Sequence, residues 1–183
     1  MDKVSVIIPT YNRFKYLLNA IKSVKQQTYS NIEIIVVNDC STQEDYYTFD
    51  FKKEFGEEFY IIHLPKNSRK TFGNVCGGGN SRNIGMMIAS GTYIAFLDDD
   101  DSFLPNKIEK QVQAMKETNC SFSCTEGYGG NNAYRANQKY RTWHYNGIYW
   151  NSLKSIFKNK TRLFENMFKN EVNVWNAEAI NIH

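Results

Sequence analysis

The chain has 183 residues, a formal net charge of +3, and a hydrophobic content of 42%. This length suits one domain with a sizeable core, and the apolar content is that of a folded chain. The charge is too small to indicate a nucleic-acid-binding protein, and no apolar run approaches the roughly 18 residues of a membrane-spanning segment. The four cysteines have no zinc-ligand spacing, so free thiols in a reducing compartment are expected and the chain is predicted to be cytoplasmic.

Short apolar runs predict five strands, and the segments between them predict helices. The strands are expected at residues 4–8, 33–37, 59–62, 93–97 and 121–124. Apolar residues at helical spacing predict a helix at about 14–27, a short helix that contains residues 84–88 and ends near Gly91, and a helix with Pro105 in its first turn and its apolar face at Ile108, Val112 and Met115. The polar segment 42–58 is predicted to be helical too, whereas the Gly/Asn-rich segment 67–80 is read as a loop. Residues 151–168 are a possible further helix.

The alternation of strands and helices predicts an α/β fold with a mostly parallel sheet flanked by helices. Ligands bind such sheets beyond the carboxyl ends of the strands. Three polar segments fall at those ends, namely residues 10–12, Asp39 and residues 98–101. The sequence therefore predicts a ligand site at this edge of the sheet.

Four consecutive aspartates, residues 98–101, directly follow a run that is predicted to be a buried strand. Carboxylates this close repel one another, and a bound divalent cation stabilises their ionised forms. Hard oxygen ligands suit Mg²⁺, Mn²⁺ or Ca²⁺. The alternative is a solvated acidic loop in which one aspartate caps the following helix.

Several motifs together resemble the family 2 glycosyltransferases, which have the GT-A fold, a Rossmann-like nucleotide-sugar-binding architecture. The matching segments are VSVIIPTYN at 4–12, QQTY at 26–29, IIVVNDCS at 34–41, GNSRNIG at 79–85 and ASGTYIAFLDDDD at 89–101. The last of these contains the Asp-x-Asp motif of the family. The resemblance covers about residues 3–118.

The resemblance implies a nucleotide-sugar site at the ends of the first two strands. Pro9, Thr10 and Tyr11 would line the pocket for the base of a nucleoside diphosphate. Asp39 would accept a hydrogen bond from the ring N–H of uracil. A turn or helix-capping aspartate is the alternative role for Asp39.

The resemblance also assigns the residues that follow. Arg82 would approach the base or the diphosphate, and its alternative is a solvated residue on a helix face. Asp98 and Asp99 would contact ribose or metal, and Asp100, together with Asp98, would bind Mn²⁺ or Mg²⁺.

The expected function is metal-dependent transfer of a sugar from a UDP-sugar to a hydroxyl of a glycan, protein or lipid acceptor, with inversion. A nucleotide-sugar-binding module without turnover is one alternative. A sugar nucleotidyltransferase is another, but the Gly-rich signature of that class, which bears Arg and Lys, is missing after the first strand.

The catalytic base expected from the family, an aspartate well after the Asp-x-Asp motif, has no counterpart here. Glu126 and Glu165 are the candidates that remain. Residues 1–126 are therefore predicted to form the donor-binding core. Residues 127–183 are predicted to form part of an acceptor-side segment, truncated before the base.

Overall fold

A computed structural model describes residues 1–73, 78–125, 127–129, 141–143 and 172–175. The chain forms two compact units, Met1–Asn106 and Lys107–His183.

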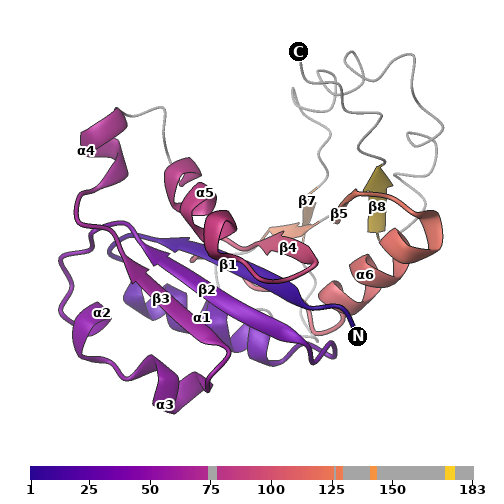
Figure 1. The fold of residues 1–183 in the computed structure, drawn as a ribbon, viewed down its shortest axis with the longest axis horizontal. Helices are drawn as coiled ribbons and strands as arrows, with labels where there is room; N and C mark the ends of the chain where they lie inside the picture. Colours follow the sequence, from indigo (N-terminus) through magenta and orange to yellow (C-terminus); the bar gives the residue numbers. More distant parts are fainter. Residues whose placement is uncertain (74–77, 126, 130–140, 144–171, 176–183) are drawn as a thin grey trace. The chain divides into compact units, whose positions relative to one another are not determined.

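A four-stranded parallel sheet forms the centre of the first unit (Figure 1). Its strands are β1 (Val4–Thr10), β2 (Ile32–Asn38), β3 (Phe59–His63) and β4 (Tyr93–Phe96), in the order β3-β2-β1-β4. Thr10 is paired with Asn38, and Asn38 with His63, so β1, β2 and β3 end at one edge. This confirms the predicted parallel α/β fold.

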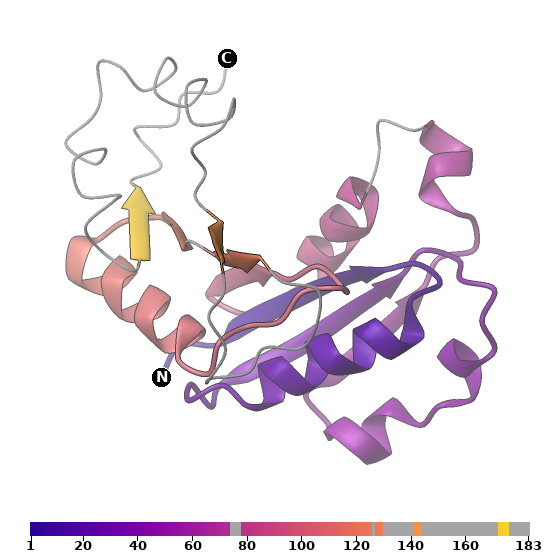
Figure 2. The same ribbon diagram turned by 180° about the vertical axis from the view of Figure 1, so that it is seen from behind.

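Helices cover both faces of this sheet. α1 (Phe14–Lys25) lies on one face and α5 (Gly79–Ile88) on the other, as Figures 1 and 2 show from opposite sides. Every residue of β1 is buried, which explains the nearly unbroken apolar sequence of that strand. The approach of α5 is close because Gly85 has no side chain. A Cβ there would lie 2.4 Å from Cγ2 of Ile7.

The segment after β2 differs from the single helix predicted for residues 42–58. It forms two short helices, α2 (Asp45–Thr48) and α3 (Phe51–Phe55). Asp50 separates them, because its side chain accepts a hydrogen bond from the Lys53 N–H and so caps a new helix.

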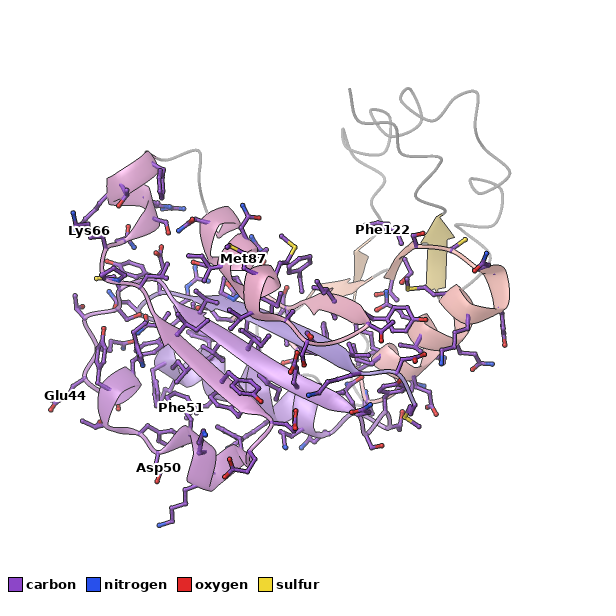
Figure 3. The ribbon with its side chains drawn as sticks, in the orientation of Figure 1. Glu44, Asp50, Phe51, Lys66, Met87 and Phe122 are labelled. Carbon is purple, nitrogen blue, oxygen red and sulfur yellow. The ribbon has the colours of Figure 1, made fainter. Side chains whose placement is uncertain are left out.

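An aromatic cluster holds these two helices against the sheet. Phe51, labelled in Figure 3, stacks on Phe59 of β3 with ring centroids 5.1 Å apart. Phe14 of α1 meets Tyr46 of α2 edge-on at 5.3 Å. Tyr46 is buried to 1% exposure, so its hydroxyl is held at a fixed place inside the unit.

Two further predictions about the first unit were wrong. The loop predicted for residues 67–80 contains α4 (Ser68–Phe72), which Asn67 caps by accepting from the Lys70 N–H. Strand β4 is only half buried, since Ile94 and Phe96 are 43% and 44% exposed. Within the described chain β4 is an edge strand, and α5 packs against β1 and β2 instead.

The described residues of the second unit form α6 (Lys107–Thr118) and four short strands. β5 (Phe122–Thr125), close to the strand predicted at 121–124, pairs antiparallel with β8 (Val172–Trp175). β6 (Gly127–Gly129) pairs with β7 (Arg141–Trp143). The possible helix at 151–168 lies outside the described residues. Within the described part of the chain, none of the helices has the length and apolar character that crossing a membrane requires.

A buried carboxylate joins the strands at the sheet edge opposite the strand ends. Glu33 is 2% exposed and accepts hydrogen bonds from the Ser5 hydroxyl at 2.5 Å and from the Ser90 N–H and hydroxyl at 2.7 Å each. Lys3 lies 3.2 Å away. Burial raises the pKa of Glu33, but these hydrogen bonds lower it by more than burial raises it, and the resulting pKa is about 2.

Replacing Glu33 with Gln is expected to lower the free energy of unfolding at pH 7 by about 1.5 kcal/mol, because an amide cannot accept from all of these donors. The folded-state pKa lies below the usual value of 4.5, so the contribution of Glu33 is complete above about pH 4.5 and is lost as the pH falls towards 2. Urea unfolding across this range checks both points. Glu57→Gln, at a side chain 88% exposed, is the control. A variant with the same stability and pH dependence as the parent would contradict the role of Glu33.

Candidate nucleotide-sugar site

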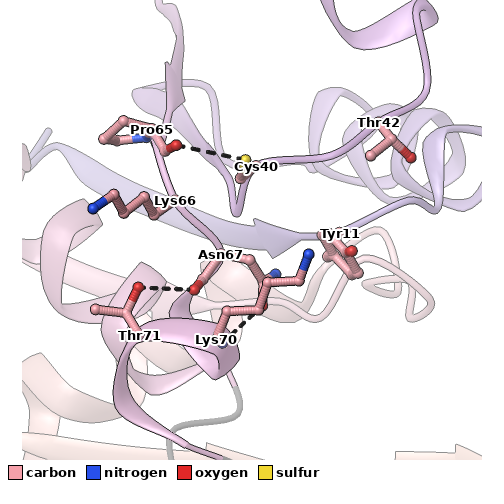
Figure 4. A pocket seen from close by; sticks show the side chains of 8 residues that line it. All are labelled: Tyr11, Cys40, Thr42, Pro65, Lys66, Asn67, Lys70 and Thr71. Carbon is pink, nitrogen blue, oxygen red and sulfur yellow. Dashed lines mark hydrogen bonds between the residues drawn. The ribbon is translucent and has the colours of Figure 1, made fainter.

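A pocket of about 450 Å³ opens at the carboxyl ends of β1, β2 and β3. Its lining residues come from the three segments that follow those strands, the last of which includes part of α4 (Figure 4). They are Tyr11, Cys40, Thr42, Pro65, Lys66, Asn67, Lys70 and Thr71. Figure 4 shows Tyr11 and Thr42 on one side and the segment from Lys66 to Thr71 on the other. The pocket lies at the sheet edge where the sequence predicted a ligand site.

Asp39 anchors one wall of this pocket. Its Oδ1 accepts from the Ser68 N–H at 2.8 Å and from the Ser68 hydroxyl at 2.7 Å. Its Oδ2 accepts from Nδ2 of Asn67 at 3.2 Å. Asp39 is 7% exposed, and its neighbours Cys40 and Asn67 line the pocket. The carboxylate thus fixes the start of α4, whose residues Asn67 and Ser68 are 28 and 29 residues from Asp39 in the sequence, instead of capping a turn next to it.

The pocket wall carries positive charge. Lys66 and Lys70 line the pocket and are exposed, and Figure 3 shows Lys66 next to α4. Ammonium groups at the mouth of a pocket attract anions such as phosphates.

The aspartates after β4 form a tight turn in which the Asp101 N–H donates to the Asp98 carbonyl at 3.1 Å. Asp98 is paired with Arg82 of α5. Asp100 accepts from Nη1 of Arg13 at 2.6 Å, and the same nitrogen lies 3.1 Å from Asp99. Arginines thus balance the charge of the first three aspartates in this structure.

The Tyr46 hydroxyl links the backbone of Arg13 to the side chain of Thr10. The Arg13 N–H donates to the Tyr46 hydroxyl at 3.0 Å, which lies 2.6 Å from the Thr10 hydroxyl. Either hydroxyl can donate in that contact. Burial raises the pKa of Asp99, while Thr10 and Arg13 act in the opposite direction.

These aspartates suit a divalent cation by their chemistry, although they do not form a closed cage. Within the described residues, no group of three or more His, Cys, Asp or Glu side chains converges on one point. The Asp100 carboxylate is 47% exposed and is already bonded to a cation, the Arg13 guanidinium. A metal ion held there would take its other oxygens from water or a ligand, as Mg²⁺ commonly does beside phosphates.

The structure divides the predicted site residues into two groups. Tyr11 lines the pocket and Asp39 supports its wall, whereas Arg82, Asp98, Asp99 and Asp100 belong to the cluster after β4. Pro9 and Thr10 are buried in β1 and are not among the residues that line the pocket, and the Thr10 hydroxyl lies 2.6 Å from that of Tyr46. Glu126 and Glu165 lie outside the described residues.

Sequence reasoning missed Arg13 and Tyr46. Arg13 follows the end of β1 by three residues, so its place at the ligand edge was a usable signal. Tyr46 gave no such signal, since its hydroxyl reaches Thr10 and the Arg13 N–H only because α2 packs against α1.

The arrangement is that of the GT-A fold. The structure of S. aureus TarS residues 1–349 in complex with UDP aligns with a TM-score of 0.59 at 26% identity, covering 74% of this chain and 38% of that one. The same TarS fragment in complex with UDP-GlcNAc aligns equally well, over 37% of its length.

The family model described as "Glycosyl transferase family 2" matches residues 5–175, and the chain belongs to this family. The putative teichuronic acid biosynthesis glycosyltransferase TuaG of Bacillus subtilis is 37% identical over 125 residues, 68% of this chain and 46% of TuaG. The Escherichia coli UDP-Glc:alpha-D-GlcNAc-diphosphoundecaprenol beta-1,3-glucosyltransferase WfaP is 37% identical over 128 residues, 70% of this chain and 47% of WfaP. The chain spans less than half the length of these two relatives.

Proposed function

We propose that the chain is the donor-binding part of a glycosyltransferase that takes its sugar from a UDP-sugar, with inversion, and passes it to an acceptor hydroxyl. One observation carries this proposal: a pocket with two lysines opens beside Asp39, at the strand edge that also bears the aspartate cluster. The TarS complexes with UDP and UDP-GlcNAc support the choice of donor, because that fragment shares the fold.

In this proposal the base of UDP lies against Tyr11, and Asp39 accepts from the uracil ring N–H or keeps that part of the wall in place. Lys66 and Lys70 attract the diphosphate. Asp98 and Asp99 face the ribose or the metal, and Asp100 binds Mn²⁺ or Mg²⁺.

The metal, when bound, supplies Lewis-acid stabilisation of the negative charge that grows on the leaving diphosphate. The protein holds the donor and orients the carboxylates, which is the electrostatic preorganisation that catalysis needs. The acceptor hydroxyl must also lose a proton to a general base. Glu126 and Glu165 remain the candidates for that base within this chain.

A thermal-shift screen of nucleotides and nucleotide sugars, with and without Mn²⁺, tests the proposal. UDP and UDP-sugars are expected to raise the melting temperature more than GDP or ADP do, because the pocket is proposed to select uracil. Equal shifts with all nucleotides, or none, would contradict it. Hydrolysis of the bound UDP-sugar then separates a working transferase core from a part that only binds.

A further inference from the structure

Arg13 lies where a cation would be expected among the aspartates. Its Nη1 donates to Asp100 at 2.6 Å and is 3.1 Å from Asp99. One guanidinium nitrogen therefore bridges two carboxylates that would otherwise repel each other. Sequence patterns and the family resemblance gave this arginine no role.

The two contacts of Arg13 differ in how readily they can be exchanged. The Asp99 side chain is 7% exposed, and a buried carboxylate of this kind needs a partner. The Asp100 and Arg13 side chains are 47% and 51% exposed, so water can replace that contact at small cost. Arg13 can thus release Asp100 while it stays paired with Asp99.

The backbone of Arg13 is fixed on both sides. Its N–H donates to the Tyr46 hydroxyl at 3.0 Å, and its carbonyl accepts from the Leu17 N–H at 3.0 Å in the first turn of α1. Any exchange of partners is therefore confined to the side chain. Rotamer changes of exposed side chains take picoseconds to nanoseconds, so this exchange does not limit ligand binding.

We propose that Arg13 is an internal counter-ion that competes with the divalent cation for Asp100, and thereby makes metal binding depend on the donor. The inference rests on the proposed function, since it takes Asp100 as a metal ligand. When a metal ion displaces Arg13 from Asp100, part of the guanidinium becomes free to donate to another anion. Arginine is well suited to phosphate oxygens, and the donor supplies a diphosphate. Metal and donor then favour each other's binding through one side chain, and such a coupling is reciprocal.

The test is a Mn²⁺ titration of the nucleotide-free protein, followed by electron paramagnetic resonance of the unbound ion. Arg13→Gln is expected to bind Mn²⁺ about fivefold more tightly than the parent, because the competing cation is gone. The matched control is Lys15→Gln, which removes one positive charge from an exposed residue of α1. It should leave the affinity unchanged. Repeating the titration with UDP present should show a smaller gain in Mn²⁺ affinity from UDP in Arg13→Gln than in the parent.

An equal or weaker Mn²⁺ affinity in Arg13→Gln would overturn the proposal, and so would an equal gain in Lys15→Gln. Arg13→Lys provides the second variant, because it keeps a positive charge for Asp99 but loses the guanidinium fork. The Mn²⁺ affinity of Arg13→Lys should lie between those of the parent and Arg13→Gln. An affinity at or below that of the parent would also count against the proposal. A parent protein that binds Mn²⁺ but not UDP would refute the proposed donor function, while the nucleotide-free titration would still decide the competition.

Discussion

Replacing Asp39 with Asn is expected to weaken UDP binding by at least about tenfold, which corresponds to the loss of a charge-assisted hydrogen bond of roughly 1.5–3 kcal/mol. The carboxylate accepts on both of its oxygens, from Ser68 on one side and from Asn67 on the other. An amide has one acceptor, so its NH₂ group must face a donor whichever way it turns. Asn67 cannot adapt by flipping, since its Oδ1 caps Lys70. Isothermal titration with UDP measures the effect.

Two further variants separate the direct role of Asp39 from its structural one. Asp45→Asn is the same substitution at an exposed aspartate and should change nothing. Ser68→Ala removes one donor to Asp39 but keeps the carboxylate, so it should retain more UDP affinity than Asp39→Asn. If Asp39→Asn melts earlier but binds UDP as tightly as the parent, Asp39 only supports α4 and does not recognise uracil.

UDP together with Mn²⁺ or Mg²⁺ should raise the melting temperature well above the effect of either component alone, and Asp100→Ala should remove most of the metal-dependent part. A ligand at 100 times its dissociation constant stabilises the folded state by about 2.7 kcal/mol, so the shift is readily measured. The Asp100 side chain is the half-exposed carboxylate that already binds the Arg13 cation. Differential scanning fluorimetry across a series of metal concentrations gives the result.

Asp101→Ala is the matched control, because it removes the same charge from the next residue of the run. It should keep most of the metal-dependent shift. If UDP stabilises the parent and Asp100→Ala equally in the presence of metal, the assignment of Asp100 is wrong. A loss with Asp101→Ala as large as that with Asp100→Ala would point to the net charge of the cluster rather than to one ligand.

The parallel sheet could be predicted from the sequence because its signals are local. β1 and β2 are apolar runs buried on both faces, and α1 has its apolar residues at helical spacing. The partial exposure of the edge strand β4 could not be predicted, since the burial of a strand depends on which other elements pack against it. Helix α4 was not predicted because the segment from 67 to 80 is rich in Gly and Asn, which is typical of a loop, so Asn67 was not recognised as a helix cap.

In the candidate site, too, the positions set by local sequence could be predicted, whereas the contacts set by packing could not. The strand-end positions of Tyr11, Asp39 and the aspartates follow from the alternation of elements and were placed correctly at one edge. The partners of those residues do not follow from it. Ser68 is 29 residues from Asp39, and Arg13 is 86 residues from Asp99, so only the folded chain brings these pairs together.

The missing side chain at Gly85 has an effect beyond packing. Ordinary contacts of a Cβ begin at 3.4 Å, whereas one at position 85 would meet Ile7 at 2.4 Å, so a side chain there would force Ile7 or α5 to shift by about 1 Å. Arg82 lies one helical turn before Gly85, so a shift of α5 would also change its position relative to Asp98. A residue that carries no functional group thus helps to set where an arginine lies at the ligand edge.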